Sequence, residues 1–217
     1  MNFKLQIFNC KLKSNDRSSN SKKKKQQKQR RTASQWQLLP FPATGYRLPV
    51  TVVGESDVKL IVGVADRAIS KSRDDVIVTH ALGSCLGIAV YDHARAVGGI
   101  LHVMLPSSSV NPGKAGENPY MFVDSGVPAF FREIFAAGGS RGSLWVKVVG
   151  GASINQSSSG DSFAIGKRNY IMLKKLFWKN GILIDAEDVG GDKARTVYLE
   201  MATGKVTISQ GGVEKTL

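Results

Sequence analysis

Short apolar runs separated by polar turns dominate the chain from about residue 57 onward. Residues 58–64 and 75–79 have the length and composition of strands. Farther on, apolar runs at 86–91 and 97–105 flank the polar segment 92–95. This pattern predicts a β-hairpin with a four-residue loop.

Two later segments carry apolar residues at helical spacing. The first, 128–137, places four apolar side chains on one stripe and is followed by two glycines. The second spans 168–179 and is followed by Asn180-Gly181, a helix stop signal. Between the hairpin and the first helix, 107–119 is rich in Ser, Asn, Pro and Gly and predicts an exposed loop. The remaining predicted strands are 144–149, 182–184, 196–201 and 205–208. We therefore expect a single α+β domain over residues 57–210, with helices covering a mainly antiparallel or mixed sheet.

The predicted hairpin brings a thiol and an imidazole together. If Tyr91 pairs with Ala96, the same register sets Cys85 directly opposite His102. Their Cβ atoms would then be about 4.5–5.5 Å apart on one face. A one-residue slip of one strand would separate them.

A cysteine needs help to act as a nucleophile, because its free pKa is about 8.5 and the thiolate is the attacking form. His102 is the candidate base, and Thr79 is the candidate residue that orients the imidazole. Gly83 and Ser84 precede the thiol and are candidates for oxyanion binding through their backbone N–H groups. The alternative is that Cys85 is a small core residue and His102 is structural.

The net charge of +13 is concentrated near the N-terminus. Residues 1–48 hold 12 Lys and Arg against one acid, Asp16, whereas residues 49–217 carry only +2. This composition predicts a disordered basic extension over 1–48. The extension is either a solvated tail or a binder of nucleic acid or anionic membranes, but we expect no nucleic acid to bind the nearly neutral folded domain.

Other features narrow the function classes. The sequence has no apolar run long enough for a transmembrane helix, and its first residues do not resemble a secretory signal. One cysteine in the extension and one in the domain predict no disulfide, which suits a reducing, cytoplasmic compartment. The histidines and Cys85 lack metal-ligand spacing, so we expect no metal and no other cofactor.

Several motifs in order resemble the CheD family of chemoreceptor glutamine deamidases. They begin with Thr79, Leu82-Gly83-Ser84-Cys85 and the turn at Asp92, then Gly98-Gly99 before His102-Val103-Met104-Leu105-Pro106. They continue with Val148-Val149-Gly150-Gly151-Ala152, Ile165-Gly166-Lys167-Arg168-Asn169, and Asp188-Val189-Gly190-Gly191 followed by Arg195. The sequence departs from the family pattern in two places, in 152–155 and at Ala194. Neither place includes one of the three candidate catalytic residues.

The resemblance implies a layered α-β-β-α sandwich and catalysis by Cys85, His102 and Thr79. It implies hydrolysis of selected glutamine side chains of methyl-accepting chemoreceptors to glutamate, with release of ammonia through a thioester. The expected substrate is the cytoplasmic domain of those receptors. A response-regulator phosphatase of chemotaxis is a further implied partner.

Three alternatives remain open from the sequence. The domain could act mainly as a regulatory module that docks on such a phosphatase. It could be another thiol amidase with a small-molecule substrate. The basic extension could also make the whole chain a nucleic-acid-binding protein.

Overall fold

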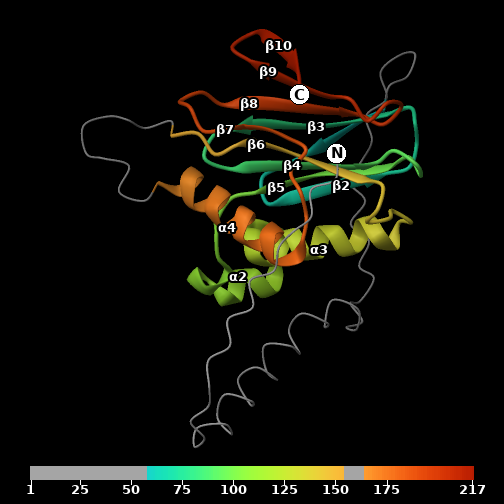
Figure 1. The fold of residues 1–217 in the computed structure, drawn as a ribbon. Helices are drawn as coiled ribbons and strands as arrows, with labels where there is room; N and C mark the ends of the chain where they lie inside the picture. The colour runs from blue at the N-terminus through green and yellow to red at the C-terminus, as the bar shows by residue number, and fades with distance from the viewer. Residues whose placement is uncertain (1–57, 154–163) are drawn as a thin grey trace, which may run out of the picture. The chain divides into compact units, whose positions relative to one another are not determined.

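The computed structural model describes residues 58–153 and 164–217. Within these ranges the chain forms two five-stranded sheets, both mixed (Figure 1). Sheet A has the order β1 (Val58–Val62), β3 (Asp75–Leu82), β8 (Arg195–Glu200), β9 (Val206–Gln210) and β10 (Val213–Thr216). Sheet B has the order β2 (Asp66–Ser70), β5 (Val97–Val103), β4 (Leu86–Asp92), β6 (Leu144–Gly150) and β7 (Ala186–Val189).

All but two of the strand pairs are antiparallel. The exceptions are β1 with β3 in sheet A and β6 with β7 in sheet B. The two sheets pack face to face over one apolar cluster, to which both contribute side chains. In sheet A, β8 alternates regularly between buried and half-buried side chains, as expected for a strand with one covered face.

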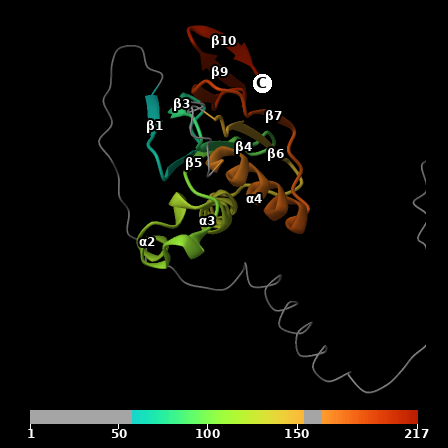
Figure 2. The same cartoon turned by 90° about the vertical axis from the view of Figure 1, so that its left-hand side faces the viewer.

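Helices cover the other face of sheet B. The long helices are α3 (Val123–Ala136) and α4 (Ile165–Asn180), and they pack with β4, β5 and β6 around a second apolar cluster. Figures 1 and 2 show both helices on the same side of the sheets. Because β4 and β5 lie between sheet A and the helices, every residue in them is buried.

The α+β class and the single domain are confirmed, and the strands form two mixed sheets. Among residues 58–153 and 164–217, no helix lies against the outer face of sheet A (Figure 2). The four-layer α-β-β-α arrangement therefore stays a prediction. The predicted extension 1–48 lies outside the described residues, and the predicted domain boundaries stay predictions. None of the helices in the described part is both long and apolar enough to cross a bilayer.

The predicted loop 107–119 is exposed but contains short helices. Asn111 and Asn118 each accept a backbone N–H at a helix start, which satisfies donors that a loop would leave to water. These asparagines nucleate single turns without any buried residue. The asparagines start α2 (Pro112–Glu117) and η3 (Pro119–Met121), and Ser107 caps the preceding turn, η2 (Ser108–Val110).

Two further predictions need correction. Helix α3 begins at Val123 rather than 128, because Val123 and Val127 extend its buried stripe past Pro128 toward the N-terminus. Of that stripe, Phe135 is 41% exposed. Residues 182–184 form no strand, because Ile182 and Ile184 pack against the helix-side cluster instead of joining a ladder.

Candidate active site

A hydrogen bond between Thr79 and His102 links the two sheets. Thr79 lies on β3 of sheet A, and His102 lies on β5 of sheet B. Thr79 Oγ1 and His102 Nδ1 are 2.8 Å apart, and neither side chain is exposed to solvent. The two residues predicted to act together are therefore brought together at the interface between the sheets.

The partners of Thr79 determine the tautomer of His102. The Thr79 hydroxyl donates its single hydrogen to the carbonyl of Val62, at 2.9 Å on the neighbouring strand β1. It can then only accept from the imidazole, so Nδ1 carries the ring proton. Nε2 is left as an unprotonated acceptor, and it is buried without a hydrogen-bond partner. This is the tautomer that a general base requires.

Burial also keeps the imidazole neutral. It lowers the pKa of His102 to about 4, and the negative charge of Asp66 offsets part of that fall. Asp66 begins β2 and pairs with His102 across the ladder. At neutral pH the ring is therefore an uncharged base.

Cys85 lies in the bend between β3 and β4. It is half-buried, reduced, and packed against the apolar cluster between the sheets. Burial raises the pKa of its thiol above the ordinary value, and a hydrogen bond from its own backbone N–H offsets part of the rise. The resting thiol is therefore protonated and needs a base.

The hairpin register differs from the predicted one. Asp92 pairs with Val97, so the loop is 93–96, and Gly87 rather than Cys85 lies opposite His102. The prediction that the thiol directly opposes the imidazole is therefore wrong.

The side chain of Asp92 accounts for the difference. Its Oδ1 accepts hydrogen bonds from the N–H groups of Ala94 and Arg95, at 2.9 and 3.0 Å, and this closes the turn one residue later than predicted. The loop has the predicted length but begins and ends one residue later. Each side chain therefore stays on the predicted face of the sheet, although its partner across the ladder changes. His102 reaches Thr79 of sheet A while Cys85 packs on the cluster between the sheets, so both side chains lie on that side of sheet B.

Three carbonyls of the Cys85 bend are held by other elements. Gly83 O accepts from Ala152 N–H at 2.7 Å, and Cys85 O accepts from Gly151 N–H at 2.8 Å. Ser84 O accepts from the side-chain amide of Asn169 on α4, at 3.0 Å. The backbone of the bend is therefore anchored on both sides of the thiol.

Gly150 allows β6 to approach this bend. Its φ is +114°, and a Cβ atom there would lie 2.2 Å from the carbonyl oxygen of Cys85. Any other residue would push the bend away from β6. The glycine is thus required by both its backbone conformation and its contact with the bend.

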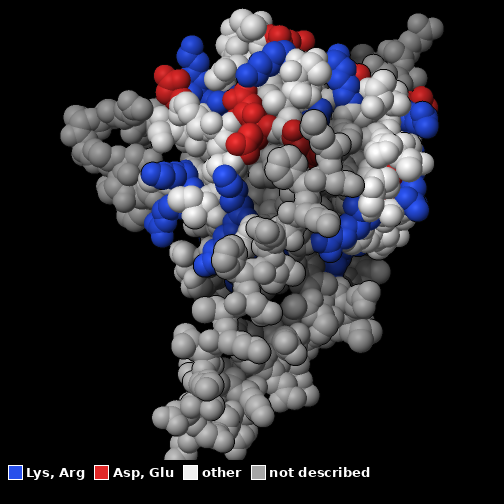
Figure 3. Space-filling model, in the orientation of Figure 1, with Lys and Arg blue, Asp and Glu red and all other residues white. Residues whose placement is uncertain are grey.

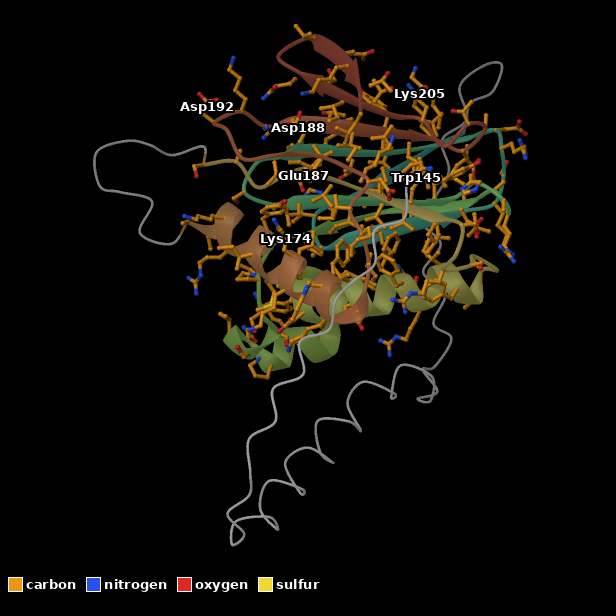
Figure 4. The ribbon with its side chains drawn as sticks, in the orientation of Figure 1. Trp145, Lys174, Glu187, Asp188, Asp192 and Lys205 are labelled. Atoms are coloured by element: carbon orange, nitrogen blue, oxygen red, sulfur yellow. The ribbon has the colours of Figure 1, made fainter. Side chains whose placement is uncertain are left out.

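Arg195 orders the turn that follows β7. Its guanidinium donates to Gly190 O at 2.6 Å, to Lys193 O at 3.0 Å and to Asp188 Oδ1 at 2.9 Å. Burial opposes ionisation of Asp188, but hydrogen bonds and charges from Lys215 and Arg195 outweigh it, so the pKa of that carboxyl is lowered. Figure 4 labels Asp188 on β7, and Figure 3 shows acidic and basic side chains intermixed on the same face.

The Arg195-ordered turn supports the end of β6. Gly190 N–H donates to Gly150 O at 2.9 Å, and Ser153 N–H donates to Gly191 O at 2.8 Å. The motif residues that follow β7 are therefore connected to the Cys85 bend through β6. Sequence reasoning assigned them no role, because their contacts are made only in the folded chain.

The other histidines lie apart from these residues. His80 and His93 are exposed, and His80 Nδ1 lies 3.4 Å from Thr196 Oγ1. In the parts of the chain that the structure describes, no three His, Cys, Asp or Glu side chains are grouped as a metal site requires.

Comparison with known proteins identifies the family. The family model described as CheD chemotactic sensory transduction matches residues 104–210. A probable chemoreceptor glutamine deamidase CheD of Solibacter usitatus is 43% identical over 159 residues, which are 73% of this chain and 93% of the relative. A probable chemoreceptor glutamine deamidase CheD 1 of Syntrophus aciditrophicus is 45% identical over 153 residues, 70% of this chain and 94% of the relative. The archaeal counterpart from Pyrococcus abyssi is 41% identical over 145 residues, 67% of this chain and 87% of the relative. From these matches, the chain belongs to the CheD family.

Proposed function

We propose that this protein hydrolyses selected glutamine side chains of methyl-accepting chemoreceptors to glutamate, releasing ammonia. The relatives are named chemoreceptor glutamine deamidases, and the observation that carries the proposal for this chain is the free Nε2 of His102. That atom is an unprotonated acceptor because Thr79 accepts from Nδ1 and donates to Val62. Cys85 is the proposed nucleophile, His102 the general base and acid, and Thr79 the orienting residue.

The first half-reaction forms a thioester. His102 Nε2 takes the proton of the Cys85 thiol as Sγ attacks the carboxamide carbon, and the carbonyl oxygen becomes an oxyanion. The imidazolium then donates that proton to the departing nitrogen, so ammonia leaves and a γ-glutamyl thioester remains. A neutral Cys85 thiol and a neutral His102 imidazole before the reaction suit this order of steps, because the proton moves only as the new bond forms.

The second half-reaction releases glutamate. His102 takes a proton from water as the water oxygen attacks the thioester carbon. Collapse of the intermediate breaks the carbon–sulfur bond, and the thiolate recovers its proton from the imidazolium. One water is consumed and one ammonia released per glutamine.

The oxyanion needs hydrogen-bond donors close to Cys85. The N–H of Gly83 donates to Ala81 O at 2.8 Å, so we assign the donor role to the N–H groups of Ser84 and Cys85. The hydrogen bond from the Cys85 N–H to its own sulfur supports this assignment, because that group already stabilises negative charge at the thiol.

The test is mass spectrometry of a receptor cytoplasmic fragment before and after incubation with the full chain. We expect the mass gain of amide-to-acid conversion at a few glutamines, lost in Cys85→Ala. Hydrolysis of free glutamine but not of the fragment would favour another thiol amidase. Binding of a response-regulator phosphatase without any deamidation would favour a docking module. The phosphatase partner and the second helical layer remain part of the proposal.

A further inference from the structure

We propose that Asn169 is a positioning residue that holds the Cys85 bend and the end of the His102 strand at a fixed separation. The inference rests on the proposed function, because it concerns the same thiol and imidazole. It adds a residue outside the catalytic three, on a different element, with a defined structural task.

The contacts of Asn169 join the two catalytic segments. Its Nδ2 donates to the carbonyl of Ser84, next to Cys85, and to the carbonyl of Met104, two residues after His102. Both distances are 3.0 Å, and the side chain is not exposed to solvent. The Cys85 bend and the β5 end therefore share one donor group.

The two carbonyls also determine which way the amide points. A flipped amide would set its oxygen against two carbonyl oxygens, so both N–H bonds of Nδ2 are directed at these acceptors. The remaining atom, Asn169 Oδ1, is buried without a hydrogen-bond partner. An unpaired buried acceptor costs stability, so burial of the amide oxygen does not explain an asparagine here.

The neighbours of Asn169 on α4 show what ordinary packing would select. Leu173 and Phe177 follow it at four-residue intervals, and both are buried on the same face of the helix. An apolar residue would continue this stripe, but it would leave the Ser84 and Met104 carbonyls without their amide donor. The asparagine is therefore explained by its two donated hydrogen bonds rather than by core packing.

A close approach of the backbone allows Asn169 to reach both carbonyls. A Cβ atom at Gly166, in the first turn of α4, would lie 2.4 Å from Gly151 O. Gly151 in turn donates its N–H to the Cys85 carbonyl. The start of α4 thus lies against the segment that anchors the bend, which brings Asn169 over it.

If Asn169 sets the separation of thiol and imidazole, removing it should uncouple them. The experiment measures the second-order rate of Cys85 alkylation by iodoacetamide near pH 7.5, using the full chain with Cys10→Ser in every variant. His102→Ala is introduced into the parent and into Asn169→Ala. We expect His102→Ala to slow alkylation about tenfold or more in the parent, as loss of a general base does. In Asn169→Ala the same change should slow it less than about threefold, and this non-additivity would show that the effects of Asn169 and His102 are coupled.

Asn180→Ala is the matched control. Asn180 lies on the same helix, and its side-chain amide donates within α4, to Leu176 O at 2.8 Å. The effect of His102→Ala should be as large in this background as in the parent. If Asn169→Ala does not fold, Asn169→Ser replaces it. Its hydroxyl can donate to one carbonyl, so an intermediate His102 effect is expected.

The outcomes separate this inference from the proposed function. An equal His102 effect in the parent, the Asn169 variant and the Asn180 variant overturns the positioning role and leaves the catalytic pair intact. No His102 effect in the parent overturns the pair and this inference with it. Alkylation needs no receptor, so the result does not depend on finding the right substrate, and deamidation of the receptor fragment is scored separately.

Discussion

The two faces of sheet B differ in what they bury. The face toward α3 and α4 contributes to a cluster of apolar side chains such as Leu101, Val103 and Phe130. The face toward sheet A is also largely apolar, but it includes His102, which is hydrogen-bonded to Thr79 of sheet A and shielded from water with it. Successive residues of β5 alternate between these environments, so Leu101 and Val103 pack in the helix-side cluster while His102, the proposed base, lies between them.

In the proposed mechanism, this difference separates the residues that stabilise the domain from those that react. On the helix side the apolar side chains of the cluster gain from leaving water. On the sheet A side, the buried imidazole is neutral and has an unsatisfied ring nitrogen, which costs stability but leaves a base free to act. Substitutions on the sheet A side should therefore reduce activity more than stability. Substitutions on the helix side should reduce stability more than activity.

The largest expected effect on activity is that of Cys85→Ala. Deamidation of a receptor fragment should fall below detection, because the thioester cannot form, while the midpoint of urea unfolding changes little. Cys85→Ser should behave alike, since a hydroxyl is a far weaker nucleophile here. Retained deamidation in Cys85→Ala would remove Cys85 from the proposed mechanism.

Phe130→Ala should show the opposite behaviour. Phe130 is fully buried on α3, and its truncation should lower the free energy of unfolding by about 3–5 kcal/mol. Deamidation per folded molecule should be unchanged. The control is Phe135→Ala on the same helix, where the ring is 41% exposed and the loss should be under about 1 kcal/mol. Equal losses for the two variants would contradict the packing described for this face.

The pH dependence of stability should reveal the cost of the buried imidazole. The pKa of His102 is lowered to about 4 in the folded chain, against about 6.5 when unfolded. The unfolded state therefore binds more protons between these values, so stability falls as the pH drops from about 6.5 to 4, by up to roughly 3 kcal/mol. Urea unfolding at pH 7.5 and pH 4.5 measures this loss.

His102→Gln is the control for that measurement. It removes the titrating group, so stability should fall less as the pH drops from about 6.5 to 4. Asp66→Asn should extend the loss of stability to lower pH, because the Asp66 charge holds the pKa of His102 up. An equal loss of stability at acid pH in the parent and in His102→Gln would show that His102 is not buried in its neutral form.

Thr79→Val should reduce deamidation less than Cys85→Ala or Cys85→Ser does. It keeps the shape of the side chain but removes the hydrogen bonds to His102 and Val62. Loss of one orienting hydrogen bond should lower kcat/KM about tenfold to a hundredfold. Thr79→Ser restores the hydroxyl and should recover most of it. A loss as complete as that of Cys85→Ala would give Thr79 a larger role than orientation.

Local signals were sufficient to predict the elements that carry the site. The apolar runs and the polar turn identified β4, β5 and a four-residue loop, and the loop length preserved the side of the sheet even though its position was wrong by one residue. The error arose because the Asp92 side chain closes the turn. Such a side-chain hydrogen bond decides between two loops that have the same length and similar composition.

Contacts between distant elements were not predictable from local pattern. The hydrogen bond from Thr79 to Val62 depends on a parallel pairing of β1 with β3, and periodicity does not specify strand order. Asn169 did leave a signal, because it is a polar residue four positions before Leu173 on a buried stripe. Its partners, the Ser84 and Met104 carbonyls, are 85 and 65 residues away.

The smallest effect is expected from removing residues 1–48. They carry +11 of the net charge of +13, and none of the catalytic candidates lies among them. A chain starting near Val50 should fold cooperatively and deamidate receptors at a rate similar to that of the full chain at moderate salt. At low ionic strength the full chain should associate faster with anionic membranes or acidic receptor surfaces, and salt should remove that advantage, because the screening length falls to about 8 Å at physiological strength. Rates measured for both chains over a salt series provide the test. If the shortened chain stays poorly active in high salt, the extension helps to build the site. The contrast between the two faces of sheet B would then not account for function alone.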